Sequence, residues 1–197
     1  YYAFNFEYEK INRLLSTVSQ SKSPLIQSEI KLEILSDEIS YDDVKLSIVN
    51  GDQMLQQIPV DVITGTIELP VFEDDTAKQL ALKLNQDKDA LVVNLNASIK
   101  PPSSTTMPYS DLFIVIEDFN RFIKKMAGAM SFFAPKTNAL KFQFDQPATI
   151  EIPANKTNYR YETNSDRAIE VKVSSRLMKE NPTVVFSVIP VSIEPTS

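Results

Sequence analysis

The sequence predicts an α+β protein, in which mostly antiparallel strands are accompanied by a few helices. Short runs with apolar residues at alternate positions recur along the chain, and this period of two is typical of strands with one buried face. One segment, residues 110–130, instead repeats apolar residues at the spacing of an amphipathic helix. The runs share no fixed period, so a repeat architecture is not predicted.

The first two predicted elements differ in their spacing. Aromatic residues at alternate positions between residues 2 and 8 predict a strand with an aromatic face. Residues 9–19 change to helical spacing and predict a short helix, which ends in the polar stretch before Pro24. We therefore expect the chain to pass from its first strand into a helix.

Extended segments dominate the next part of the chain. Residues 26–34 and 44–48 each place apolar side chains on one face, and the turn at residues 50–52 contains Asn and Gly, which tolerate positive φ. Two further extended segments, QMLQQIPVDVIT (53–64) and GTIELPV (65–71), each contain a proline. Because proline cannot donate to a strand ladder, we expect these segments at sheet edges or strand ends.

A second short helix and a linker precede the long helical segment. Residues 74–85 predict a helix with aspartate at its N-terminus, and residues 91–99 alternate as a strand. The stretch KPPSSTTMP (100–108) is stiffened by two prolines and is the clearest linker. We therefore expect a single α+β domain over residues 1–197, with residues 100–108 as the candidate subdomain boundary.

The long helix predicted over residues 110–130 carries charged residues on the face opposite its apolar stripe. Asp111 suits the positive end of the helix dipole, whereas Lys124 and Lys125 suit the C-terminal half. A helix of this kind usually packs its stripe across a sheet, so we expect the stripe to be buried. The stripe consists of Leu112, Val115, Ile116, Phe119, Phe122, Ile123 and Met126.

Five residues beside this stripe are the candidate recognition residues. Phe113 and Ile114 widen the apolar surface, and Met130, Phe132 and Phe133 follow at the helix exit. The flexible Met side chain adapts to varied partners, so we expect these residues to bind a protein partner or a hydrophobic ligand. Truncating a flank phenylalanine should then cost less stability than truncating a stripe phenylalanine.

Composition excludes several classes of function. The 197 residues carry a formal net charge of −6 and include neither Cys nor His. A structural zinc site needs Cys or His ligands, and a protease triad needs an imidazole base. The excess of acidic residues and the scattered basic residues are unlike a nucleic-acid interface. The sequence contains no run of 18 apolar residues, so we expect no membrane span. We therefore expect no metal site, no cofactor and no nucleic-acid partner.

Carboxylates remain available for catalysis, because acid–base chemistry does not require His. The acidic turn at residues 36–43 lacks the spacing, the Gly and the final Glu of a helix–loop–helix calcium site, so we expect a solvated turn. A carboxylate-dependent hydrolase, with or without a metal ion, is the alternative function. Its candidate residues are Asp37, Glu38, Asp42, Asp43, Asp74 and Asp75.

Four stretches together resemble a known family: FNFEY (4–8), GTIELPV (65–71), MPYSDL (107–112) and NPTVVFSVIPVSIEP (181–195). In this order they resemble a family of small exported proteins of marine gamma-proteobacteria, which is known only as a domain of unknown function. The resemblance covers almost the whole chain. It implies a removed signal peptide and a periplasmic or cell-envelope location, but it implies no catalytic or binding residue.

The start of the chain agrees with that expectation. The chain begins at Tyr1, without an initiator Met or a basic-then-apolar leader, as a processed chain does and as a truncated chain also would. The sequence therefore predicts a non-enzymatic periplasmic or cell-envelope protein that binds a protein partner or a hydrophobic ligand.

Overall fold

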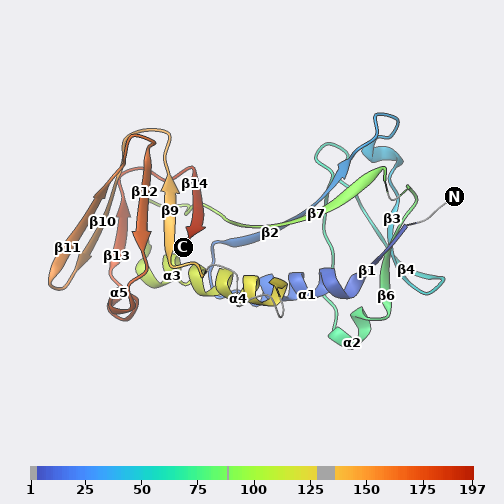
Figure 1. Ribbon diagram of the computed structural model, residues 1–197, viewed down its shortest axis with the longest axis horizontal. Coiled ribbons are helices and arrows are strands. Elements are labelled where there is room, and N and C mark those ends of the chain that lie inside the picture. The colour runs from blue at the N-terminus through green and yellow to red at the C-terminus, as the bar shows by residue number, and fades with distance from the viewer. Residues whose placement is uncertain (1–3, 88, 128–135) are drawn as a thin grey trace. The chain divides into compact units, whose positions relative to one another are not determined.

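The computed structural model describes residues 4–87, 89–127 and 136–197 and shows an α+β architecture. The strands pair in antiparallel fashion, and a few helices lie between them in the chain (Figure 1). The fold class predicted from the two kinds of spacing is therefore confirmed.

The chain divides into two units, and it passes between them more than once. Unit 1 contains Tyr1–Ser19 and Ser28–Ala97, whereas unit 2 contains Gln20–Gln27 and Ser98–Ser197. The linker predicted at residues 100–108 lies inside unit 2, just after the chain enters that unit for the second time.

Unit 1 contains a four-stranded sheet with the order β1-β6-β3-β4 (Figure 1). Gly51, in the turn between β3 and β4, has a φ of +57°, as the Asn-Gly signal in the sequence predicts. Strands β2 and β7 each have residues in both units. The elements are β1 (Phe4–Glu7), α1 (Tyr8–Ser19), β2 (Ile26–Ile34), the 3-10 helix η1 (Tyr41–Asp43), β3 (Leu46–Asn50), β4 (Gln53–Ile58), β5 (Thr66–Ile67), α2 (Asp74–Ala77), β6 (Leu80–Leu84) and β7 (Leu91–Ile99).

The helix predicted over residues 74–85 is wrong beyond its first turn. After α2 the chain forms β6, which pairs with β1 on one side and β3 on the other. Leu80, Leu82 and Leu84 are at most 5% exposed, and Lys83 between them is exposed. Leucines at alternate positions fit a half-buried strand, and pairing on both sides outweighs the helix propensity of Leu, Ala and Lys.

Helix α1 confirms the helix predicted over residues 9–19, and its side chains hold a neighbouring extended segment. The buried Tyr8 hydroxyl donates to the Pro70 carbonyl at 2.7 Å. The side-chain amide of Asn12 donates to the Phe72 carbonyl at 2.9 Å and accepts from the Phe72 N–H at 2.7 Å. These bonds fix the chain just before α2, because they supply partners for backbone groups outside any strand ladder.

Unit 2 contains a four-stranded sheet with the order β11-β10-β13-β8 and the neighbouring strands β12, β9 and β14 (Figure 1). Their buried apolar side chains form one core cluster with α3, the start of α4 and α5. The elements are β8 (Thr106–Pro108), α3 (Tyr109–Phe113), α4 (Val115–Ala127), β9 (Ala139–Gln143), β10 (Thr149–Ala154), β11 (Thr157–Glu162), β12 (Ala168–Lys172), α5 (Ser175–Glu180), β13 (Thr183–Phe186) and β14 (Ser192–Thr196).

The segment predicted as one long helix is divided into α3 and α4, with Ile114 between them. The helix begins one residue earlier than predicted, at Tyr109, and this buried side chain extends the stripe three residues toward the N-terminus. Phe113, four positions after Tyr109, therefore lies on the buried face as well. The rings of Tyr109 and Phe113 stack with centroids 4.2 Å apart, and Phe113 is 1% exposed. Phe119, which was expected in the core, is only partly buried. The expectation that Phe113 lies on an accessible flank is therefore wrong.

This placement reverses the order of stability losses expected from the sequence. Phe113→Ala should lower the free energy of unfolding by about 3–5 kcal/mol, because it empties a buried site between two aromatic rings. Phe119→Ala should lower it by clearly less, because part of that ring already faces solvent. Urea unfolding of both variants measures the difference. Equal losses, or a larger loss for Phe119→Ala, would contradict the observed packing.

Candidate functional site

The carboxylates considered for hydrolysis are engaged locally in unit 1. Asp43 accepts hydrogen bonds from the backbone N–H and the hydroxyl of Ser40, at 3.0 and 2.7 Å, and these bonds hold its pKa below the usual value. Asp75 pairs with Lys78 at 2.9 Å, which lowers the pKa of Asp75 as well. Both side chains are therefore ionised near neutral pH and are poor proton donors.

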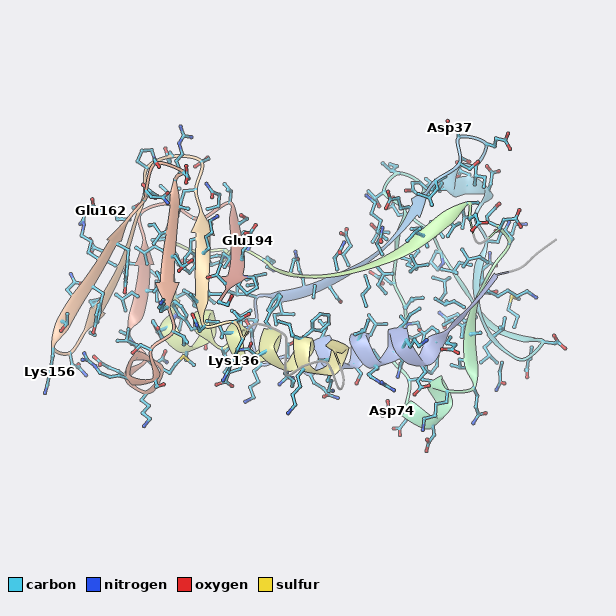
Figure 2. The ribbon with its side chains drawn as sticks, in the orientation of Figure 1. Asp37, Asp74, Lys136, Lys156, Glu162 and Glu194 are labelled. Atoms are coloured by element: carbon cyan, nitrogen blue, oxygen red, sulfur yellow. The ribbon has the colours of Figure 1, made fainter. Side chains whose placement is uncertain are left out.

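The remaining acidic candidates do not gather around a common point. Figure 2 shows Asp37 on the loop before η1 and Asp74 at the start of α2, and the two side chains point away from one another. Glu38 and Asp42 are exposed. Within residues 4–87, 89–127 and 136–197, no group of three or more acidic side chains is placed to hold a metal ion. These positions therefore give no specific support to a carboxylate-dependent hydrolase.

Asp118 in unit 2 is the buried charged side chain in the described part of the chain, at 2% exposed. Its Oδ2 accepts the backbone N–H groups of Lys22 and Ser23 at 2.9 and 2.8 Å, and its Oδ1 accepts from Arg121 at 2.6 Å. The sequence placed Asp118 on the polar face of the long helix, but the 22–23 loop covers it. Because both oxygens hold neighbouring groups, Asp118 has a structural role.

Strand β4 combines an open backbone edge with exposed apolar side chains. It is the outer strand of its sheet, and among the described residues it pairs with β3 alone. Five of its six residues are exposed, including Met54 at 63% and Leu55 at 48%. An outer strand presents unpaired N–H and C=O groups along its free side. Backbone donors, backbone acceptors and apolar side chains therefore face solvent together at β4.

A bulge in β4 contributes to the exposure of Leu55. Gln56 lies opposite Ile48 and Met54 lies opposite Val49, so Leu55 has no cross-strand partner on β3. The extra residue of a bulge bends the strand and redirects its side chains, and bulges are frequent at sheet edges and beside functional sites. The bulge in β4 thus interrupts the ladder at an exposed leucine.

The other outer strands of the described sheets carry protecting features that β4 lacks. Strand β11 contains Arg160 and Glu162, and β12 contains Glu170 and Lys172. Strand β8 ends at Pro108, and β1 and β5 have only four and two residues. Charges, proline and short length all hinder the addition of another strand. The sequence of β4, QMLQQI, has neither charge nor proline, so its bulge is its main protection.

The loop that follows β4 carries a second exposed apolar pair. Val62 is 53% exposed and Ile63 is 86% exposed. The Oδ1 atom of Asp61 accepts the N–H groups of Ile63 and Thr64 at 2.9 and 2.8 Å, and the N–H of Gly65 donates to the Asp61 carbonyl at 2.8 Å. These bonds fix the loop while its apolar side chains stay in solvent.

Gly65 fixes the other end of this loop. Its φ is +71°, and a Cβ atom there would lie 2.6 Å from both the Leu32 carbonyl oxygen and the Tyr41 ring. Both the conformation and the close approach require glycine. We call residues 53–63 the exposed segment. It contains four of the ten exposed large hydrophobic side chains of the described chain, which makes it the candidate functional site.

The sequence-predicted recognition residues lie elsewhere. Phe113 is in the core of unit 2, and Ile114 is half-buried between α3 and α4. Met130, Phe132 and Phe133 lie outside the described residues. Residues 53–64 were expected at a sheet edge or a strand end because of Pro59, but their pattern indicated no function. The available signal was an uncharged stretch with apolar residues that ends at a proline.

Comparison with known proteins adds no relative to this description. No protein-family model matches the chain, and no curated protein or solved structure matches it significantly. Among the described residues, none of the helices has the length and apolar character needed to cross a membrane. The geometry of the site is therefore the guide to its function.

Removal of the Asp118 carboxylate should destabilise unit 2. In Asp118→Ala, the part-buried N–H of Lys22 and the buried N–H of Ser23 lose their acceptor and Arg121 loses its ionic partner, so the free energy of unfolding should fall by about 1–3 kcal/mol. Glu117→Ala is the matched control, since Glu117 is exposed and 3.6 Å from Lys22, and it should change stability by less than about 0.5 kcal/mol. Urea unfolding compares the two. Similar urea midpoints for both variants would show that the Asp118 carboxylate does not stabilise unit 2.

Stability should also fall at alkaline pH because of buried tyrosines. Burial raises the pKa of Tyr109 to about 12, although the Ser174 N–H that it accepts opposes the shift. An unfolded tyrosine titrates near pH 10. The stabilising effect is therefore complete below about pH 10 and is lost as pH rises toward 12, because the unfolded state ionises first.

Urea midpoints between pH 8 and pH 12 measure this loss. Tyr109→Phe should reduce the slope above pH 10, and Tyr8 and Tyr161, whose pKa values burial also raises, should account for the slope that remains. At neutral pH the variant should be less stable by about 1–3 kcal/mol, because the Ser174 N–H loses its acceptor. An unchanged slope in Tyr109→Phe would contradict the assignment.

Proposed function

We propose that this protein is a non-enzymatic binding protein of the periplasm or cell envelope, and that its partner is another protein. The partner adds an extended segment to the free side of β4. One observation carries the proposal: β4 is an outer strand without charge or proline, and it exposes Met54 and Leu55 beside an open backbone edge.

Strand addition explains why these features occur together. The free N–H and C=O groups of an outer strand supply affinity for any extended chain, and neighbouring side-chain contacts supply specificity. A lipid or another apolar ligand would use the exposed side chains but would leave the backbone groups of β4 without new partners. A protein segment satisfies both, so it is the better occupant of the two kinds that the sequence suggested.

The location rests on the resemblance to small exported proteins. This resemblance supports export, and photo-crosslinking combined with cell fractionation tests location and binding together.

Site-specific photo-crosslinking in intact cells tests the proposed function. A photoreactive residue replaces Met54 on the outer strand in one variant and Lys83, exposed on the interior strand β6, in the control. Irradiation followed by fractionation should give an adduct with a discrete partner at Met54, in the periplasmic or envelope fraction, and none at Lys83. Equal adducts at both positions, or none at Met54, would contradict binding at β4. Recovery in the cytoplasm would contradict the location.

A further inference from the structure

We propose that the segment captured by β4 is an extended stretch of another protein with alternating apolar residues, bounded at its ends by Lys or Arg. This inference rests on the proposed function and identifies the chemistry of its partner. It follows from the juxtaposition of an uncharged strand edge, which exposes Met54 and Leu55, with a strongly acidic unit.

The charges of the protein are divided unequally between its units. Unit 1 contains 16 Asp and Glu against 7 Lys and Arg, a formal charge of −9, whereas unit 2 contains 10 against 13, a charge of +3. The exposed segment therefore belongs to the acidic unit. Such a unit attracts cationic chain segments and speeds their association, most strongly at low ionic strength.

Two carboxylates flank β4 in the chain. Asp52 directly precedes the strand, and Asp61 follows it in the fixed loop. The hydrogen bonds from Thr64 and Ile63 hold the pKa of Asp61 below its usual value, so it is ionised near neutral pH. The exposed Lys45 precedes Leu46, which pairs with Ile58 at the end of β4, so this lysine opposes a cation at that end. The two flanking carboxylates and the net charge of unit 1 outweigh this single lysine, so a segment with apolar residues at its centre and cations at its ends matches the surroundings of β4.

A second copy of the chain fits the edge less well. Pairing β4 with β4 would bring together two units that each carry a formal charge of −9. It would also align two bulged strands, and a bulge interrupts the regular ladder that edge-to-edge pairing needs. An anionic lipid surface meets the same repulsion. A cationic, flexible segment of a different protein meets neither obstacle.

Binding of synthetic peptides to the full chain tests this chemistry. One fluorescent peptide alternates Val and Thr between pairs of Lys, and its control has Glu in place of Lys. Fluorescence anisotropy should show that the lysine peptide binds at least about tenfold more tightly at low salt, with the difference shrinking at 1 M salt, where the screening length is about 3 Å. Hydrogen exchange should show protection of residues 53–58 by the lysine peptide.

Charge variants identify the groups responsible. The double variant Asp52→Asn and Asp61→Asn should weaken binding of the lysine peptide about fivefold. Both loop bonds of Asp61 end on Oδ1, so the amide of Asn retains an acceptor for them. Asp37→Asn, on a separate loop of the same unit, is the matched control and should leave the affinity unchanged (Figure 2).

Each result bears on the inference or on the proposed function separately. Three results would overturn the inference that the captured segment is cationic. They are equal or tighter binding of the glutamate peptide, an unchanged affinity in the double variant, and protection from hydrogen exchange outside β4. If neither peptide binds, the inference of a cationic segment is overturned as well. A crosslinked adduct at Met54 would in that case still support strand addition at β4. Concentration-dependent dimerisation with protection of β4 would instead assign the edge to a second copy. Loss of both the adduct and peptide binding would overturn the proposed function itself.

Discussion

Backbone N–H and C=O groups that leave solvent need hydrogen-bond partners, and helix side chains repeatedly supply them in this protein. Asn12 on α1 exchanges two hydrogen bonds with the backbone of Phe72, and Asn120 on α4 does the same with Thr137. Asp118 accepts two N–H groups from the loop before β2. These side chains take the place of a neighbouring strand, so extended segments can pack beside helices within each unit.

The same requirement acts at the edges of the sheets, where water serves as the partner. Most outer strands are short or charged, and this discourages the approach of another chain. Strand β4 instead exposes Met54 and Leu55 along an uncharged edge. Its open backbone groups are tolerated in the free protein because water reaches them, and a bound segment would replace that water without disturbing the core.

The net charge of the whole chain conceals a large difference in charge between its two units. A net charge of −6 over 197 residues is unremarkable and identifies no partner. Once the chain is divided, its acidic residues concentrate in the unit that carries the exposed segment, and the other unit is weakly basic. Electrostatic attraction depends on this local charge, because salt screens interactions beyond about 10 Å.

The sequence by itself determined the elements whose residues interact locally: the helix at α1, the turn at Gly51, the extended character of residues 53–58 and the exclusion of His- and Cys-dependent chemistry. Tertiary structure alone decided that residues 80–84 form a central strand, because Ala77, Leu80, Ala81 and Leu84 also fit helical spacing, and the choice depends on pairing with β1 and β3 on either side. It also placed Phe113 in the core against Tyr109. Whether a strand is central or outer depends on partners distant in the chain, so the open edge of β4 could be recognised only in the folded protein.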